Sequence, residues 1–248
     1  MLGAAAAAFF YLVLLASSSF ATSSPKTPFF AKPPRAVEAL MGGSADFLHP
    51  AGWLASAMAH PITLALFTSA ALVVSAGAIA AELERGTIDF VLSRPVGRLR
   101  FLMAKAAAAL TAVTFVEAMG LAGALIARAT ITAVGQIGLL QIARLFAGSW
   151  LLFAAFSMVG LFISSRSSLR GRATAASAGV VVVAFFTNFA ALLIDGIYPL
   201  RFISPFHYFA AAEVMSGSGL WALTALAGLA LAAAGGAVFT FAHRDLTR

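Results

Sequence analysis

Long apolar runs recur along this chain, separated by short polar breaks. The runs cover approximately residues 2–20, 62–81, 101–127, 145–163, 173–194 and 220–242. About 20 apolar residues in a helix cross the roughly 30 Å hydrocarbon core of a bilayer, and a helix satisfies its own backbone there. The runs lack the strict alternation of a membrane β-barrel. The pattern predicts an all-α polytopic membrane protein with six transmembrane helices, and one transmembrane domain over residues 1–248.

Composition agrees with this class. The chain is 61% hydrophobic and 10% charged, and its formal net charge is +7. In a membrane protein we interpret such a charge as basic loops beside anionic lipid, so we expect no nucleic-acid partner. The chain has no cysteine, and its four histidines show no metal-ligand spacing. We therefore expect no disulfide, no metal site and no cofactor bound by this chain.

The distribution of lysine and arginine predicts the orientation. With the N-terminus inside, ten of the 16 fall in cytoplasmic segments and six in outer ones. The ten are Arg85, Arg94, Arg98, Arg100, Lys105, Arg166, Arg170, Arg172, Arg244 and Arg248. The positive-inside rule then places both termini in the cytoplasm, and we expect a multi-pass protein of a bacterial plasma (inner) membrane. The first run could instead be a cleaved signal peptide, but no basic residue precedes it, which favours a retained helix.

The segment before the last run has the composition of a re-entrant turn. Pro199 and Pro205 interrupt it, and it carries five aromatic residues between positions 198 and 209. A proline-broken, aromatic segment at membrane depth is tolerated where it packs on protein or lines a cavity. We therefore predict a possible re-entrant segment there.

A polar island over residues 82–100 separates the second and third runs. Gly86 breaks the preceding helix, Thr87 can cap the next one, and Pro95 ends it. Ile88, Val91 and Leu92 follow helical spacing and would form one apolar stripe. The pattern predicts a short amphipathic helix over about 86–94 on the cytoplasmic surface. From these residues alone, it could cap the bundle or dock another protein.

The same island carries a family resemblance. The string Glu82-x-Glu-Arg-Gly-Thr-x-Asp-x-x-Leu-Ser-Arg-Pro-Val-x-Arg98, followed by Lys105, resembles the first cytoplasmic loop of type-2 (exporter-type) ABC transporter permeases. Ile203-Ser-Pro-Phe-His207 and Arg244-Asp-Leu are similar to the same family's pattern. Members usually begin with a basic amphipathic helix, whereas this sequence opens in its first apolar run, so the resemblance does not extend to an N-terminal ATPase contact of that kind.

The resemblance implies the membrane-spanning subunit of an ATP-driven exporter. Such a subunit pairs with a second protomer, as a homodimer or a related heterodimer, through an interface that includes the first and fifth helices. Two cytosolic ATPase subunits would hold ATP and magnesium and seat the short helix in a groove. The implied coupling residues are Glu82, Glu84, Arg85, Gly86, Thr87, Ile88, Asp89, Val91, Leu92, Arg94, Pro95 and Arg98. No Gly-x-x-x-x-Gly-Lys-Ser/Thr loop occurs, so we expect no ATPase site on this chain and no enzyme.

Polar side chains within the runs are candidates for the translocation cavity. A charged residue near the bilayer centre costs about 2.5–3.5 kcal/mol on insertion scales, so Glu117 should face protein or a cavity. It could line the cavity, couple protons, or form a structural hydrogen bond between helices. We group it with Phe185 and Asn188 as the candidate cavity. A proton-coupled secondary transporter using Glu117 is the alternative function.

Overall fold

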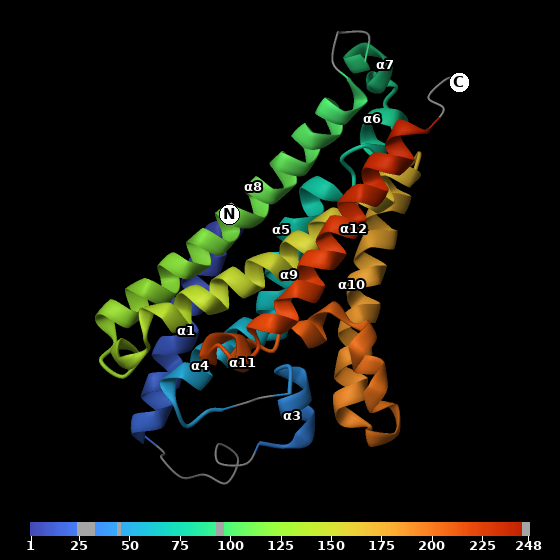
Figure 1. Cartoon of the computed structure of the whole chain (residues 1–248). Coiled ribbons are helices and arrows are strands. Elements are labelled where there is room, and N and C mark those ends of the chain that lie inside the picture. Colours follow the sequence, from blue (N-terminus) through green and yellow to red (C-terminus); the bar gives the residue numbers. More distant parts are fainter. Residues whose placement is uncertain (24–32, 44–45, 93–96, 245–248) are drawn as a thin grey trace.

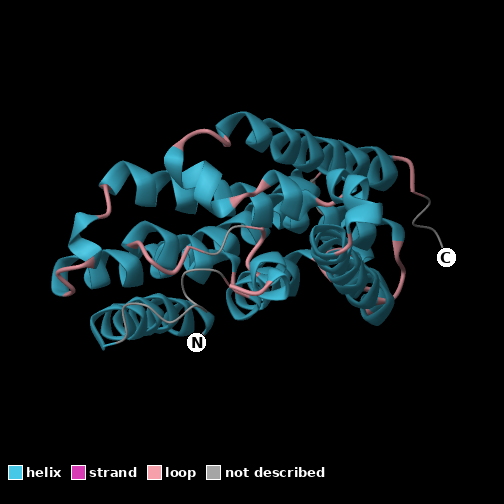
Figure 2. Cartoon of the chain, turned by 90° about the horizontal axis from the view of Figure 1, so that it is seen from below, coloured by secondary structure: helices cyan, strands magenta, loops and turns pink. Residues whose placement is uncertain are grey.

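A computed structural model describes residues 1–23, 33–43, 46–92 and 97–244. In these ranges the regular structure is helical and contains no strand (Figures 1 and 2). The chain is an all-α polytopic membrane protein. Its α-helices are α1 (Leu2–Ser23), α3 (Arg35–Leu40), α4 (Pro50–Ala59), α5 (Pro61–Ser75), α6 (Ala80–Glu84), α7 (Thr87–Leu92), α8 (Arg98–Thr130), α9 (Leu139–Arg166), α10 (Arg170–Leu193), α11 (Ala211–Ser216) and α12 (Leu223–Ala242). Short 3-10 helices are η1 (Val134–Gln136), η2 (Asp195–Ile203), η3 (Pro205–Tyr208) and η4 (Leu220–Ala222).

Five of the described helices are long and apolar enough to span a membrane, and a sixth span requires a bent pair. That pair is α4 and α5, which meet at 50°. The bend lies at His60, whose backbone is extended, and Pro61 then opens α5. The bend has a local cause, because a proline disfavours helical geometry in the residue before it and lacks an amide to donate.

The predicted second span, residues 62–81, is a continuous helix only as far as Ser75. Residues 76–79 form a turn, and α6 then begins at Ala80. The amides of Ile79 and Ala80 donate to Ser164 Oγ on α9, at 3.0 and 3.1 Å, instead of to carbonyls one turn earlier. A side chain from another helix therefore ends the span earlier than hydropathy indicates.

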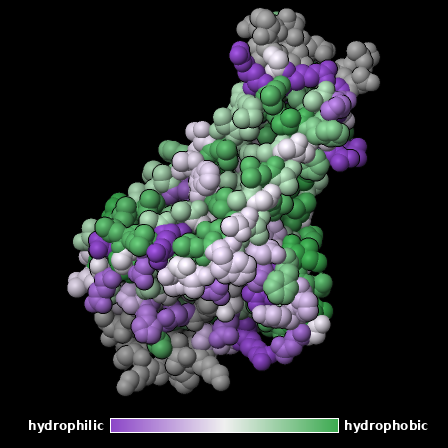
Figure 3. Space-filling model, in the orientation of Figure 1, coloured by the Kyte–Doolittle hydropathy of each residue, from purple (hydrophilic) through white to green (hydrophobic). Residues whose placement is uncertain are grey.

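The two ends of the bundle are polar and the middle is apolar. The short helices α6 and α7 and the end of α12 lie together at one end, which we call the α7 end (Figure 1). The helices α3 and α4 lie toward the opposite end, the α3 end (Figure 1). Hydrophilic side chains gather at both ends, and most of the hydrophobic surface lies between them (Figure 3). This banding is expected of a protein whose middle contacts hydrocarbon.

The segment after α10 folds back along that helix. The 3-10 helix η2 packs against α10, and the Ser204 hydroxyl donates to the Ala184 carbonyl at 2.8 Å, more than two turns before α10 ends. Phe206 then reaches the bundle interior, with its ring 5.1 Å from that of Phe156. The segment therefore turns back toward the bundle interior, and its re-entry into a membrane stays a prediction.

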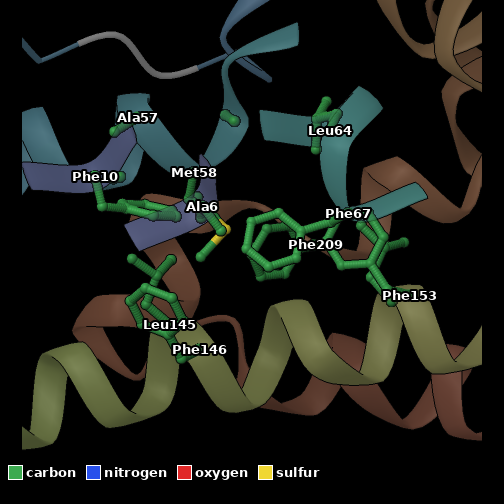
Figure 4. Packing of buried hydrophobic residues seen from close by; sticks show 14 of the residues in the cluster. Ala6, Phe10, Ala57, Met58, Leu64, Phe67, Leu145, Phe146, Phe153 and Phe209 are labelled. Carbon is green, nitrogen blue, oxygen red and sulfur yellow. The ribbon is translucent and has the colours of Figure 1, made fainter. Parts of the chain in front are cut away.

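Aromatic rings from α1, α5 and α9 form the centre of the larger core (Figure 4). The Phe10 ring lies 5.2 Å from Phe146 and 6.2 Å from Phe67, and Phe67 stacks on Phe153 at 5.3 Å. Such offset and edge contacts are the favoured geometries of aromatic pairs. The three helices are thus fixed to each other at the level of these rings.

Small residues bring α1 close to α8. A Cβ atom added to Gly123 on α8 would lie 2.2 Å from the carbonyl oxygen of Ala7 on α1. Close backbone approach of this kind is a common basis of helix association in membranes. The pairing of α1 with α8 therefore requires glycine at position 123.

We predict that Gly123→Ala lowers the thermal stability of the purified protein, because its methyl group must push the two helices apart. The matched control is Gly179→Ala on α10, where an added Cβ meets nothing within 4 Å. Alanine in a helix is favoured over glycine by about 0.5–1 kcal/mol, so the control should be neutral or more stable. Differential scanning fluorimetry of both variants in one detergent is the measurement. Equal midpoints would contradict the close α1–α8 packing.

Candidate functional site

At the α7 end, α6 is tied to α8 by an ion pair. The Lys105 ammonium lies 2.8 Å from Glu82 Oε1, and the Thr87 hydroxyl donates to Oε2 of the same carboxylate. The hydrogen bond from Lys105 lowers the pKa of Glu82 below its ordinary value, and the bond from Thr87 acts in the same direction. Glu82 therefore stays ionised and links α6, α7 and α8.

Two further contacts tie α6 and its C-terminal end to α9 and α10. The Ser164 hydroxyl accepts the first amides of α6, as described above. The Glu84 carboxylate accepts the backbone N–H of Arg170, the first residue of α10, at 2.7 Å. A carboxylate at a helix N-terminus satisfies an otherwise unpaired amide and interacts favourably with the helix dipole. Glu84, which we predicted as a coupling residue, thus caps α10.

Two arginines close the C-terminal ends of the neighbouring helices. Arg98 at the start of α8 donates to the carbonyls of Ala242 and Arg244, at 3.1 and 2.9 Å. Arg244 in turn donates to the carbonyls of Ser165 and Ser167 after the last turn of α9, at 2.6 and 3.0 Å. Arg98 was a predicted coupling residue. The capping roles of Arg244 and Ser164 were missed, because nothing in the local sequence indicates which distant helix end they meet.

The helix α7 differs from its prediction in two respects. Gly86 has φ of 69°, a left-handed conformation that favours glycine, and it turns the chain between α6 and α7. The helix begins at Thr87, whose hydroxyl bonds Glu82 instead of capping α7. Ile88 is only 3% exposed and packs in a second core with Ile79 and Phe101, so its side chain faces the bundle, and its coupling role stays a prediction.

The outer side of α7 is marked by Phe90, which is 67% exposed. Arg85 lies just before the helix, and its side chain donates to the Ala81 carbonyl. The side chains of Asp89, Val91 and Leu92 lie outside the described part of the structure, as do the whole residues Arg94 and Pro95. The coupling role that the resemblance implies for all these residues stays a prediction.

A second candidate feature is a groove on the side of the bundle. It has a volume of about 550 Å³ and lies between α5 and α10. Phe185, one of the predicted cavity residues, lines its wall, and Phe206 from the re-entrant segment contributes there too. Leu72 and Val73 of α5 and Arg170 of α10 line it as well. Its lining is apolar apart from a few hydroxyls and that arginine.

The structure brings two of the three predicted cavity residues together. Phe185 and Asn188 both line a small space of about 20 Å³ beneath α3, and Phe185 also lines the groove, whereas Glu117 lines neither. Glu117 is buried between α8 and α9, where its Oε2 accepts from Ser149 at 3.0 Å. The role of these residues in translocation stays a prediction. Sequence position indicates depth along the helices but does not reveal the face that each side chain occupies.

Glu117 is weakly satisfied for a buried carboxyl group. Its Oε1 has no hydrogen-bond partner among the described residues. The Ser149 hydroxyl has one proton and is also within hydrogen-bond distance of the Phe146 carbonyl, at 3.1 Å, so the two acceptors share it. The hydrogen bonding of Glu117 is therefore incomplete, and its role stays a prediction.

The fold and its two features define a multi-pass α-helical membrane protein with one braced polar end and a lateral apolar groove. The chain belongs to the ABC-2 family transporter proteins, whose family model matches residues 4–242. No curated protein and no solved structure matched the chain. Membership supports a permease subunit of an ABC transporter, associated with ABC ATPase subunits.

We predict that acid loosens α6. The folded pKa of Glu82 lies below 4.5, so the Lys105 tie is complete above that pH and is lost as the pH falls through the folded value. Amide protection of residues 80–84, normalised to free-peptide exchange rates, should therefore fall on acidification in the wild type. In Glu82→Gln it should be low throughout the same pH range. Wild-type protection that does not fall at any pH below 4.5 at which the protein stays folded would contradict the tie.

We also predict that Glu117→Met leaves the protein at least as stable as the wild type. A buried polar group with few partners can be replaced by an apolar group of similar shape at little cost or with a gain. The comparison is the thermal midpoint of Glu117→Met with those of Glu117→Gln and Ser149→Ala. A fall of several degrees in Glu117→Met alone would make the glutamate structural.

Proposed function

We propose that this chain is the membrane-spanning subunit of an ATP-driven exporter. In this proposal the α7 end is cytoplasmic and two copies of an ABC ATPase dock on it. The ATPase subunits hold ATP and magnesium and carry out hydrolysis, and this chain carries the translocation pathway. The family match supports the permease role, and the excess of lysine and arginine at the α7 end supports its cytoplasmic orientation.

The bracing of α6 is the observation that carries this proposal. A force applied to α7 passes through Gly86 to a five-residue helix with side-chain ties to three spans. Glu82 reaches Lys105 on α8, Glu84 reaches the start of α10, and the first amides of α6 reach Ser164 on α9. Packed side chains and hydrogen bonds of this kind are the physical means by which distant sites are coupled. A helix that only capped the bundle would not need ties to three separate spans.

The outer side of α7 supplies the contact for the ATPase. Phe90 is 67% exposed, whereas Ile88 is buried against the bundle. Aromatic side chains seated in a partner's pocket are typical centres of binding energy. Arg85 and Asp89 would then fix the orientation, because charges at the rim contribute more to specificity than to affinity.

The second copy of the chain is part of the proposal. The candidate spans in α1 and α10 are each only 22% buried, and both expose apolar side chains. A second protomer against α1 and α10 would cover part of these faces. The groove beside α10 would then lie next to the dimer interface.

We predict that Phe90→Asp releases the ATPase. The wild-type chain, purified from membranes with its ABC ATPase, is compared with Phe90→Asp and with Leu48→Asp. Leu48 is an exposed apolar residue near the α3 end, so it is a matched control for the same change of chemistry. The amount of ATPase that co-purifies with Phe90→Asp should be at least tenfold lower than with the wild type. The thermal midpoint of Phe90→Asp should be unchanged, and Leu48→Asp should retain the wild-type amount of ATPase. Full retention of the ATPase by Phe90→Asp would contradict docking through α7.

A further inference from the structure

The groove between α5 and α10 is apolar along its length and charged at one end. Its apolar lining includes Leu64, Val181 and Phe186, and Arg170 contributes its one charged side chain. From Arg170 to Phe186 is 16 residues of helix, or about 24 Å at about 1.5 Å per residue, so the groove follows most of the depth of a hydrocarbon core. A volume of about 550 Å³ is within the range of about 300–1,000 Å³ typical of ligand pockets.

The guanidinium of Arg170 is held at the mouth of this groove. Its backbone N–H is fixed by Glu84, and its side chain lies close to Gly77, where an added Cβ would come within 3.1 Å of Arg170 Cγ. In the part of the chain that the structure describes, no carboxylate oxygen lies within 4.0 Å of the guanidinium. An arginine in this position offers a fork of donors that suits a carboxylate or a phosphate.

A polar atom midway along the groove is also without a partner. Thr68 on α5 lines the groove, and its buried hydroxyl has no hydrogen-bond partner among the described residues. Beyond it, Phe185, Phe186 and Phe206 form an aromatic end, with the Phe185 and Phe206 rings 5.8 Å apart. The groove therefore changes from cationic to aromatic along its length.

We propose that this groove binds an anionic single-chain amphiphile, with its headgroup on Arg170 and its chain along α5 and α10 toward Phe206. Complementary charge selects the headgroup, and the apolar walls of two neighbouring helices hold one chain. As the substrate class of the transporter this inference rests on the proposed function. The binding itself needs neither ATP nor an ATPase, so it is measured separately.

The connection between Arg170 and Glu84 gives this site a second property. Arg170 is the first residue of α10, and its amide is bound by the C-terminal residue of α6. The residue that receives the headgroup is therefore tied directly to the element proposed to dock the ATPase. Occupation of the groove and the position of α6 are thus linked through one residue.

The test uses the full chain in nanodiscs of phosphatidylcholine, without ATPase. A diazirine-bearing laurate is photocrosslinked, and the labelled peptides are identified by mass spectrometry. Labels should fall on residues 64–73 and 174–186. Dodecyl phosphate should compete, and dodecyltrimethylammonium should compete at least tenfold less well. Equal competition by the cation, or labels confined to other helices, would overturn the proposal.

Two pairs of variants separate the headgroup from the chain. Arg170→Ala should weaken laurate labelling and phosphate competition about tenfold or more, while Arg172→Ala, two residues further along α10 and outside the groove lining, should not. Val182→Trp should fill the groove and abolish labelling, whereas Val183→Trp, on the exposed side of α10, should leave it intact. The thermal midpoint of each variant verifies that it folds. If Arg170→Ala does not fold, the comparison of Val182→Trp with Val183→Trp tests the site. Unchanged labelling in both Arg170→Ala and Val182→Trp would overturn the site.

Other occupants give different results. If phosphatidylglycerol added to the nanodiscs displaces laurate as well as dodecyl phosphate does, the groove holds bilayer lipid and the proposal fails. If crosslinks join two copies of the chain across the groove and exclude the probe, a second copy fills it and the proposal also fails. Specific laurate binding in a chain that binds no ATPase would instead keep the site and refute the exporter role.

Discussion

Helix ends leave backbone amides and carbonyls unpaired, and this protein pairs them at the α7 end with side chains from neighbouring helices. Glu84 takes the first amide of α10, Ser164 takes two amides of α6, and Arg98 and Arg244 take the final carbonyls of α12 and α9. Each contact satisfies a polar group and also fixes one helix to another. The arrangement of the spans at this end therefore depends on capping together with the apolar packing of the second core, around Ile79, Ile88 and Phe101.

The difference between the capped α7 end and the packed middle of the bundle has a mechanical consequence. In the centre of the bundle the rings of α1, α5 and α9 interlock, and a packed core of this kind responds to strain by moving as a unit. The helix α10 has few buried side chains and meets the rest of the bundle along one narrow seam, which includes Ala173, Ser177, Val181 and Asn188. It is held at its start by Glu84 and farther along by the bond from Ser204 to Ala184. A sparsely packed helix is thus held in position by polar contacts at its start and farther along its length.

Hydropathy predicts much of this fold, because a bilayer imposes its length and polarity on every span. The six apolar runs correspond to the long helices and the bent pair, and the proline-rich segment after α10 folds back along that helix. The break at residues 76–79 could not be predicted, because its cause is Ser164, more than 80 residues later in the chain. The same limit applies to Ile88, whose helical spacing indicates an apolar stripe but not which side of the stripe meets the bundle.

The candidate site, like the fold, has parts that the local sequence predicts and parts that depend on distant residues. The local sequence around Gly86 is sufficient to predict a turn followed by a short helix, since a left-handed glycine and an apolar stripe act within a few residues. Arg170 was assigned only to a basic cytoplasmic loop, because its role depends on Glu84 and on the walls of α5. Glu117 lies between α8 and α9, whereas Phe185 lies on α10 beside the groove. The position of a residue along a helix determines its depth in the membrane. The neighbouring helices determine whether its side chain faces a cavity, another helix or lipid. Arg170 is proposed to bind a ligand through its side chain, and its backbone amide is bound by Glu84. A residue with two such roles can be identified only once the neighbouring helices are in place.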